Sequence, residues 1–346
     1  MLVFSVNRLK STALSDIMTM EKVELTTHND HEILSAFLPI YMHSLRLESI
    51  LDFDIYIYTG DRMVLFRASH LPFTEKVREN LIERDVKRLY ISREHRRQYQ
   101  KYIESNINNI LDDPHVDAFT KVSIIYDSAK ELLKDVFADP VKGENIRRSQ
   151  DLVESTVMYI LGGQNALHNM LRVMSFDYSV YTHSVNVCTF ALALASASGI
   201  EKSQKLIELG TGAILHDIGK VKIPGEILYK AGPLNQSEMN QIREHPQWGV
   251  ELVSETDLIP PASYIPIKQH HERQNGSGYP DHLQGDDIHP FGKIVAIADA
   301  FDAMTTQRIY RGAKTSFSAL KTMFDYELGY DPHLLEIFTR LMGPGR

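Results

Sequence analysis

The hydrophobic pattern of the chain changes at Asp112-Asp113-Pro114, and this change limits what the chain can fold into. Before it, short alternating runs rich in aromatic and β-branched residues predict strands. After it, strand signals nearly vanish and apolar residues recur at helical spacing. A proline after two aspartates is typical of a boundary, because the residue before a proline avoids helical geometry. We therefore expect an α+β N-terminal domain followed by an all-α domain.

The first domain is expected to contain a hairpin. Phe53–Tyr58 and Met63–Ala68 alternate in polarity on either side of a turn-like segment, Thr59–Arg62. Apolar positions within 31–50 indicate a short helix. The further elements expected here are a helix over 74–85, a strand over 86–92 and an amphipathic helix over 93–111.

A length of 346 residues favours about two domains, at roughly 150 residues each. We expect a lead-in segment over 1–30, a small regulatory domain over 31–115, a helical linker over 116–150 and a catalytic domain over 151–346. The helices expected after residue 115 cover 116–138, 146–175, 178–198, 202–217, 236–254, 290–305 and 316–340.

Charge and cysteine content exclude several classes of protein. The formal net charge is -8, which argues against a surface for nucleic acid polymers. One cysteine, Cys188, cannot form an intrachain disulfide, which fits a reducing cytoplasm. No apolar run reaches the roughly 20 residues of a membrane span, and the apolar start of the chain is too short for a secretory signal. We expect a cytoplasmic protein that is not in a membrane.

Histidines and aspartates in apolar surroundings predict a metal site. His216-Asp217 pairs an imidazole with a carboxylate that can bridge two ions, although such a pair alone means little. Asp299 lies in an apolar run, where a carboxylate is costly to bury unless it meets a cation or several donors. The absence of thiolate ligands argues against a structural zinc site. The candidate ligands are His183, His216, Asp217, His245, His270, His271 and Asp299.

Four motifs built on these residues resemble the HD-GYP family. His216–Pro224 resembles the HD phosphohydrolase signature, and His270–Pro280 looks like the HHE and GYP motifs. Tyr181–Val187 is similar to the first histidine motif of the family. Asp299–Thr305 is similar to its last metal motif, which Arg308–Arg311 follows. The motifs occur in the order of the family, and the resemblance covers about 150–340.

The resemblance implies an all-α HD-GYP domain that hydrolyses cyclic di-GMP to linear pGpG or on to GMP. It also implies two divalent metal ions, often iron or manganese, and sometimes a third. One ion would be held by His183, His216, Asp217 and Asp299. Asp217 would bridge to a second ion held by His245, His270 and His271. Some members have a glutamate where this chain has Ser179, which favours two ions here unless Asp177 or a neighbour substitutes.

The chemistry that the resemblance implies is attack by a metal-bridging hydroxide, with Asp217 and Lys220 as catalytic residues. Lys220, Tyr279, Arg308 and Arg311 would bind the substrate. From the residues alone, each of these cations could equally be a solvated surface charge, and Tyr279 could be a packed turn residue. Gly276 and Gly278 would shape the GYP loop. Asp302 and Thr305 would orient ligands. We expect Arg243, Pro246, Trp248 and Met304 to be framework.

Two other functions stay open. The chain could be a catalytically weak receptor for cyclic dinucleotides that signals through partner proteins, although the intact ligand set argues against this. It could also be an HD hydrolase for another nucleotide. The N-terminal domain shows no receiver-type acidic pocket or phosphate loop, and we expect it to be regulatory or to dimerise. The long amphipathic helices within 116–175 predict a homodimer.

Overall fold

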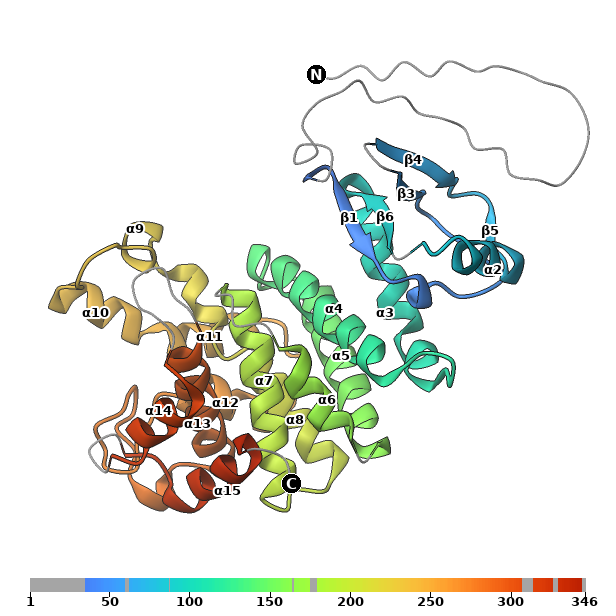
Figure 1. Ribbon diagram of the computed structural model, residues 1–346. Coiled ribbons are helices and arrows are strands. Elements are labelled where there is room, and N and C mark those ends of the chain that lie inside the picture. The colour runs from blue at the N-terminus through green and yellow to red at the C-terminus, as the bar shows by residue number, and fades with distance from the viewer. Residues whose placement is uncertain are drawn as a thin grey trace, which may run out of the picture. The chain divides into compact units, whose positions relative to one another are not determined.

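The computed structural model describes residues 35–59, 62–86, 88–163, 165–174, 179–306, 314–325 and 329–343. The chain divides into two compact units between Val116 and Asp117 (Figure 1). This division lies two residues after Pro114. The predicted lead-in, 1–30, falls outside the described residues.

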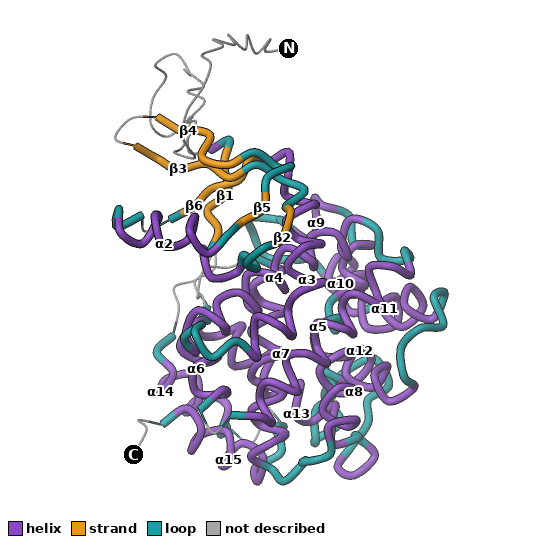
Figure 2. Tube along the Cα trace, turned by 90° about the vertical axis from the view of Figure 1, so that its right-hand side faces the viewer, coloured by secondary structure: helices purple, strands orange, loops and turns teal. Residues whose placement is uncertain are grey.

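The first unit is built on a four-stranded antiparallel sheet with the strand order β1-β6-β3-β4 (Figure 2). Strands β2 and β5 form a separate two-stranded ribbon. The strands are β1 (Phe37–Ile40), β2 (Ser49–Ile50), β3 (Ile55–Thr59), β4 (Arg62–Arg67), β5 (Pro72–Phe73) and β6 (Leu89–Ser92). The helices of this unit are α2 (Glu75–Glu83) and α3 (Arg96–Asp112).

Most local predictions for this unit are confirmed. The hairpin is β3–β4, and α2 begins where predicted because the Thr74 side chain accepts a hydrogen bond from the Val77 amide. The predicted helix within 31–50 is wrong. Residues 37–40 form β1 instead, because their backbone pairs with β6 while Phe37 and Ile40 bury their side chains.

Aromatic packing closes the core of the first unit. Phe53 is fully buried, and its ring meets those of Tyr99 and Tyr102 edge-on at centroid distances of 5.4 and 5.5 Å. Both tyrosines come from α3. Strand side chains such as Ile55 and Ile91 fill the same core.

The described residues of the second unit form helices and connecting loops, with one isolated bridge between Asn275 and Gln284. Helix α7 lies at its centre and packs against α4, α8, α13 and α15. The helices are α4 (Ala118–Ala138), α5 (Gly143–Gly162), α6 (Ala166–Val173), α7 (Val180–Ala197), α8 (Ser203–Ile214), α9 (Gly225–Leu228), α10 (Gln236–Arg243), α11 (His245–Ser254), α12 (Tyr264–Gln269), α13 (Pro290–Thr305), α14 (Ser316–Met323) and α15 (Pro332–Met342).

Three of the predicted helices are interrupted, and each forms two shorter helices in the structure. The segment 146–175 breaks after Gly162, 236–254 breaks at Glu244, and 316–340 breaks before Pro332. The expected linker, 116–150, also differs from what the structure shows. It forms α4 and the start of α5, and these helices pack on α7 and α8 inside the second unit.

Helix α7 is, among the described residues, the one helix long and apolar enough to cross a membrane by length and composition. Its most apolar 18-residue window is 78% buried inside the protein. The helix also buries the polar side chains of His183 and Asn186. This is the profile of a core helix that carries site residues.

Candidate metal centre

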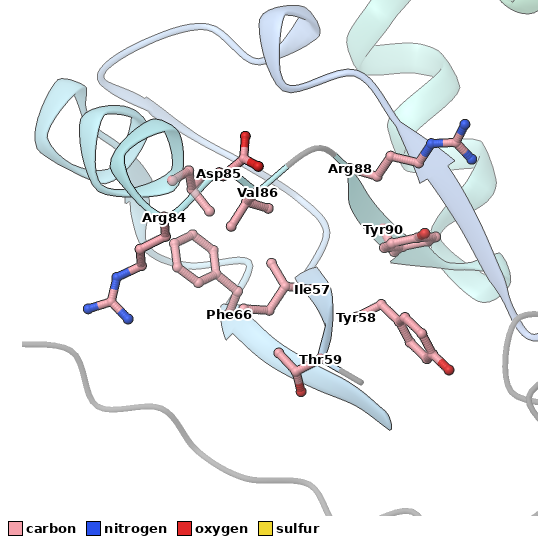
Figure 3. A pocket seen from close by; sticks show the side chains of 10 residues that line it. Ile57, Tyr58, Thr59, Phe66, Arg84, Asp85, Val86, Arg88 and Tyr90 are labelled. Atoms are coloured by element: carbon pink, nitrogen blue, oxygen red, sulfur yellow. The ribbon is translucent and has the colours of Figure 1, made fainter. Parts of the chain in front are cut away.

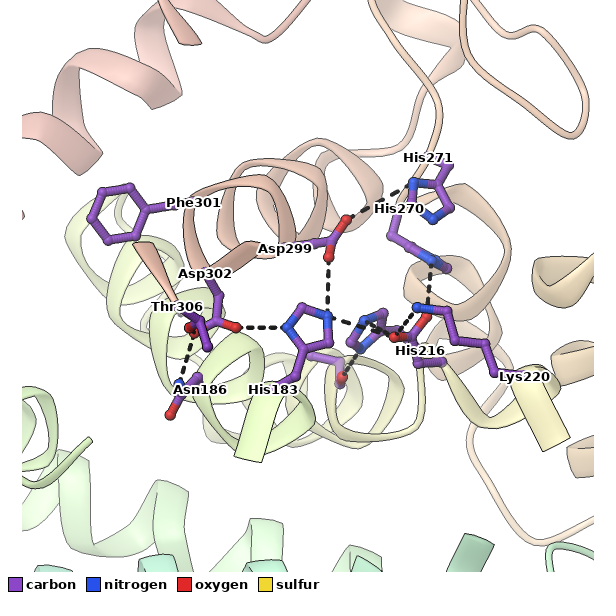
Figure 4. A network of polar contacts seen from close by, with 12 residues as sticks. His183, Asn186, His216, Lys220, His270, His271, Asp299, Phe301, Asp302 and Thr306 are labelled. Atoms are coloured by element: carbon purple, nitrogen blue, oxygen red, sulfur yellow. Dashed lines mark hydrogen bonds and ion pairs between the residues drawn. The ribbon is translucent and has the colours of Figure 1, made fainter. Parts of the chain in front are cut away.

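The seven predicted ligands come together inside the second unit. Figure 4 labels His183, His216, His270, His271 and Asp299 among them. His183 lies on α7, His245 on α11 and Asp299 on α13. His216 and Asp217 lie in the turn between α8 and the 3-10 helix η3 (Ile218–Lys222), and His270 and His271 directly follow α12. Side chains that are far apart in sequence therefore meet at one point. Six of the seven are buried, and the His271 side chain keeps 20% of its surface exposed.

Gly219 lets the His-Asp turn approach α11. A Cβ atom at this position would lie 2.0 Å from the His245 carbonyl oxygen and 2.6 Å from the Gly249 amide nitrogen. Neither backbone atom can move away cheaply, so a side chain at 219 would separate η3 from α11. The glycine thus brings Asp217 within reach of His245.

The ligand atoms form two groups. His183, His216 and Asp217 offer atoms within 4.8 Å of one another, and so do His245, His270 and His271. Histidine nitrogens and carboxylate oxygens at this spacing suit divalent transition metals.

Asp217 lies between the two groups. Its Oδ2 atom is 3.5 Å from His183 Nε2 and 3.4 Å from His216 Nε2. Its Oδ1 atom is 3.3 Å from His245 Nε2 and 3.8 Å from His270 Nε2. Each carboxylate oxygen therefore faces a different histidine group, which is the arrangement that a bridging ligand needs.

Three histidines are held by the backbone three residues before them. The Nδ1 atoms of His216, His245 and His270 lie 2.8, 2.7 and 3.0 Å from the carbonyl oxygens of Ala213, Ile242 and Ile267, respectively. A carbonyl can only accept, so Nδ1 carries the proton in each case and Nε2 presents a lone pair to the centre. This is the tautomer that binds a metal through Nε2.

These tautomers leave acceptors facing one another. His245 Nε2 and His270 Nε2 are 3.1 Å apart, and both are lone-pair acceptors once Nδ1 holds the proton. His216 Nε2 and Asp217 Oδ1 are buried and make no hydrogen bond to the described residues. Buried acceptors of this kind are costly unless a cation satisfies them. The donor set therefore fits divalent metal ions.

The charge state of the centre also suits metal binding. Burial opposes ionisation of Asp217, but the Lys220 ammonium and the neighbouring imidazoles hold the pKa of its carboxyl well below the usual range. Burial and neighbouring imidazoles lower the pKa of His270 and His271 well below 6.5. Asp217 is thus an anionic carboxylate, and His270 and His271 are neutral imidazoles, which are the forms that coordinate a metal.

His183 differs from the other histidines. Burial lowers its pKa, but hydrogen bonds to Asp299 and Asp302 outweigh burial and raise the pKa to about 9. Its Nε2 is 3.1 Å from Asp299 Oδ1, whose partner oxygen Oδ2 is 3.9 Å from His271 Nδ1. Asp299 therefore faces both histidine groups, whereas the resemblance to the family assigned it only to the group of His183 and His216.

Lys220 and Tyr279 both border the centre. Lys220 Nζ lies 2.5 Å from Asp217 Oδ2. The Tyr279 ring stacks on His271 with a centroid distance of 4.6 Å, and the Arg243 guanidinium lies 5.6 Å from the centre of the tyrosine ring. Arg243 was predicted to be framework, yet it lies on the ring of a predicted substrate residue. The other two predicted substrate residues, Arg308 and Arg311, lie outside the described residues.

The GYP loop is shaped in two different ways by its glycines. Gly276 has a φ of +76°, which favours glycine. Gly278 does not adopt such a φ, but a Cβ there would lie 2.5 Å from the His271 carbonyl oxygen. Tyr279 donates its amide hydrogen to that same oxygen at 3.2 Å. Gly278 is therefore needed for space, and it keeps the tyrosine against the metal ligand.

Glu272 lies within the predicted HHE and GYP motifs, His270–Pro280, and the structure gives it a role that the sequence did not predict. It is buried, and its carboxylate oxygens accept hydrogen bonds from the amides of Asp281 at 2.7 Å and Leu283 at 3.0 Å. This carboxylate fixes the chain that follows the GYP loop. The position of this glutamate directly after His270 and His271 was the sequence signal for such a role.

The residues around His183 were predicted in part. Asp302 lies 2.6 Å from His183 Nδ1, as its predicted orienting role requires. The prediction for Thr305 is wrong, because its hydroxyl donates to the Phe301 carbonyl one helical turn back. Thr306 contacts the Asp302 carboxylate instead. Asn186 also binds Asp302 and was missed, although a buried amide in an apolar helix is a signal.

The first unit contains a cavity of about 520 Å³ (Figure 3). Its apolar wall comes from the sheet and α2, while Arg84 and Arg88 stand on either side of it. The lining residues are Ile57, Tyr58, Thr59, Phe66, Leu81, Arg84, Asp85, Val86, Arg88 and Tyr90. No histidine is among them, so the cavity is chemically unlike the metal centre.

Comparison with known proteins finds a matching family model and several similar sequences. Residues 167–334 match the family model described as HD domain. The chain is 31% identical over 224 residues to "Cyclic di-GMP phosphodiesterase PA4108" of Pseudomonas aeruginosa, covering 64% of this chain and 54% of the relative. It is 34% identical over 197 residues to "3'3'-cGAMP-specific phosphodiesterase 2" of Vibrio cholerae, covering 56% of this chain and 36% of the relative. The chain thus spans about half or less of these relatives.

A solved structure extends the likeness to both units. Bd1817, described as an HDG"Y"P protein from Bdellovibrio bacteriovorus, is 25% identical, with a TM-score of 0.63. The match covers 88% of this chain and 99% of that one. The HD-domain match and this likeness agree with the buried His-Asp centre and with the GYP loop stacked on it, so the chain is similar to HD-GYP proteins.

Proposed function

We propose that this protein is a metal-dependent phosphodiesterase that hydrolyses cyclic di-GMP to linear pGpG or on to GMP. The observation that carries the proposal is the position of Asp217, whose two oxygens each face a different histidine group at 3.3–3.5 Å. Such a carboxylate can bridge two cations, and two neighbouring cations can stabilise both the attacking and the leaving oxygen in the hydrolysis of a phosphodiester. The relative from Pseudomonas aeruginosa carries the same activity in its name.

The proposed cofactor is a pair of iron or manganese ions. His183, His216, Asp217 and Asp299 would hold one ion, and His245, His270 and His271 would hold the other with Asp217. When bound, the ions would lower the pKa of water and neutralise the phosphate. We propose two ions because Ser179 is occupied as a helix cap, its hydroxyl accepting from the Thr182 amide at 3.0 Å. Asp177 lies outside the described residues.

Lys220 has two roles in this proposal. Its ammonium neutralises one oxygen of Asp217 at 2.5 Å, and its side chain keeps 21% of its surface exposed beside the centre. A cation at this position could shift to a phosphate oxygen and stabilise the charge that develops during the reaction. Asp217 and Lys220 are therefore our catalytic residues.

Tyr279 would form a wall for the substrate. Its ring is held on His271 and is about parallel to that imidazole, with an interplanar angle of 28°. A flat aromatic surface beside a metal ligand suits stacking with a guanine base. Arg308 and Arg311 remain proposed partners of the substrate phosphates.

Turnover by metal-loaded protein tests the proposal. The full chain would be loaded anaerobically with Fe(II) or Mn(II), given cyclic di-GMP, 3'3'-cGAMP and nucleoside monophosphates, and assayed by product chromatography with metal analysis of the same sample. Formation of pGpG or GMP supports the proposal. Binding of cyclic di-GMP without turnover under both metals would favour the receptor. Turnover of another nucleotide but not of cyclic di-GMP would favour an HD hydrolase for that nucleotide. The most informative of these substrates is 3'3'-cGAMP, because a Vibrio cholerae relative is named for it.

The proposed homodimer is supported by exposed apolar side chains on the long helices. Phe119 on α4 is 54% exposed, and Met158 and Leu161 on α5 are 57% and 44% exposed. Met158 and Leu161 are three residues apart and so share one face of α5. Light scattering would give the mass in solution, and Met158→Glu should convert the dimer to monomers.

We also propose a regulatory role for residues 31–115 and a cytoplasmic location. The cavity beside Arg84 and Arg88 gives the N-terminal unit room for a small ligand. Signalling partner proteins remain a prediction that pull-down with and without cyclic di-GMP would test.

A further inference from the structure

His183 is held differently from the three histidines that bond a nearby carbonyl. Its Nδ1 atom lies 2.6 Å from Asp302 Oδ2, a side chain 119 residues away in sequence (Figure 4). The ring orientation of this ligand therefore depends on how well Asp302 is fixed.

Two buried side chains fix Asp302 through its other oxygen. Asn186 Nδ2 donates to Oδ1 at 2.7 Å, and Thr306 Oγ1 donates to it at 3.1 Å. Asp302 and Asn186 are fully buried, and Thr306 is 2% exposed. In such surroundings each hydrogen bond is strong and costly to lose.

The Asn186 amide is held in turn by Tyr126 on α4. The Tyr126 hydroxyl donates to Asn186 Oδ1 at 2.8 Å, and this contact is buried. Turning the amide over would place its oxygen against an Asp302 oxygen, so that two acceptors would meet. The Asp302 carboxylate thus selects this amide orientation, and the Tyr126 hydroxyl, which donates to the amide oxygen, holds the Asn186 side chain in place against Asp302.

We propose that Tyr126 and Asn186 are positioning residues that set the affinity of the centre for metal through Asp302 and His183. The inference rests on the proposed metal centre. Tyr126 lies outside residues 167–334, so it is not part of the matched HD domain. Helix α4, the first helix after the division at Val116–Asp117, would thereby belong to the metal site.

Tyr126→Phe tests the proposal, because it keeps the ring and removes the hydroxyl. We expect Mn²⁺ to bind the metal-depleted full chain about 10- to 100-fold more weakly, the range found for outer partners of metal ligands. Isothermal titration calorimetry would measure the affinity for Mn²⁺. The electron paramagnetic resonance spectrum of bound Mn²⁺ would report the changed ligand geometry. Ser123→Ala is the matched control, since Ser123 is a buried residue on α4 whose hydroxyl donates to the local Phe119 carbonyl at 2.9 Å.

A double-mutant cycle separates positioning from general stability. Tyr126→Phe and Asp302→Asn should be strongly non-additive in Mn²⁺ affinity if they act through one chain of contacts. Asn186→Ala serves as a second probe of the same chain should Tyr126→Phe fold poorly. Wild-type affinity in both Tyr126→Phe and Asn186→Ala would overturn this inference alone. Absence of Mn²⁺ binding by the wild type would overturn the proposed function as well.

Discussion

The two units bury different kinds of side chain. In the described part of the N-terminal unit, the buried polar residues are Ser44 and Gln100, and the core is otherwise apolar. The second unit buries carboxylates and imidazoles around α7, where ionised groups are expensive to desolvate. Ordinary folding does not need such a core. The contrast teaches that buried charge, more than helix content, marks the part of the molecule built for chemistry.

The largest expected effect comes from Asp217→Asn. The amide keeps the shape of the side chain but removes the charge and the bridging ability, so metal content and phosphodiesterase activity should fall together by more than about 1,000-fold, beyond the loss typical of an outer partner. Metal analysis and turnover on one sample would measure both. Full activity in this variant would show that the buried carboxylate is structural, as in any well-packed domain.

Phe53→Ala should destabilise the first unit and leave the stability of the second unit unchanged. Removing a fully buried ring that meets Tyr99 and Tyr102 should lower the free energy of unfolding of that unit by about 3–5 kcal/mol. Chemical denaturation would measure this. Mn²⁺ affinity should stay at the wild-type value, and a matching loss of affinity would mean that the two cores are not separate.

Lys220→Met should separate binding from chemistry inside the second unit. Loss of an ammonium 2.5 Å from Asp217 Oδ2 removes a cation that competes with metal, so metal affinity should hold or rise. The turnover rate should fall by about 100-fold, the scale of a lost electrostatic contact in a transition state. Unchanged turnover would assign Lys220 to charge balance alone.

The smallest effect is a pH dependence of the metal-free protein. The pKa of His183 is raised to about 9, above its ordinary 6.5, by the nearby carboxylates after burial is overcome. Its stabilising contribution is therefore complete below pH 6.5 and is lost as the pH rises through about 9. Melting temperatures of chelated protein at pH 6 and pH 9.5 should show the decrease. Asp302→Asn should flatten it, and an equal decrease in that variant would exclude His183 as its source.

The sequence predicted the helical class and the residues that gather at the centre. The pattern succeeded because costly residues in apolar helices, such as Asp299, stand out against their neighbours. It failed at helix breaks such as Glu244, although Pro246 in the first turn of α11 was an available signal of a new helix. It also failed at β1, because a strand is stabilised by a partner that is distant in sequence, here β6.

Within the site, local contacts were predictable and remote ones were not. Asp302 was expected to orient a ligand because it lies three residues from Asp299. Tyr126 gave no signal, since a tyrosine on an amphipathic helix reads as ordinary core. Its role depends on Asn186 lying beside it, which no spacing in the sequence encodes.

The carbonyl contacts of His216, His245 and His270 have a consequence for how such a protein can change over generations. Each of these imidazoles takes its orientation from the residue three places earlier, so the ligand and its holder are inherited as one short piece of sequence. Drift elsewhere in the chain leaves them unaffected. The Nδ1 atom of His183 instead meets Asp302 on α13, and Asp302 is held through Asn186 by Tyr126 on α4. In the proposed metal centre, substitutions at positions such as Tyr126 would therefore change the affinity for metal, while the other three imidazoles keep their orientation.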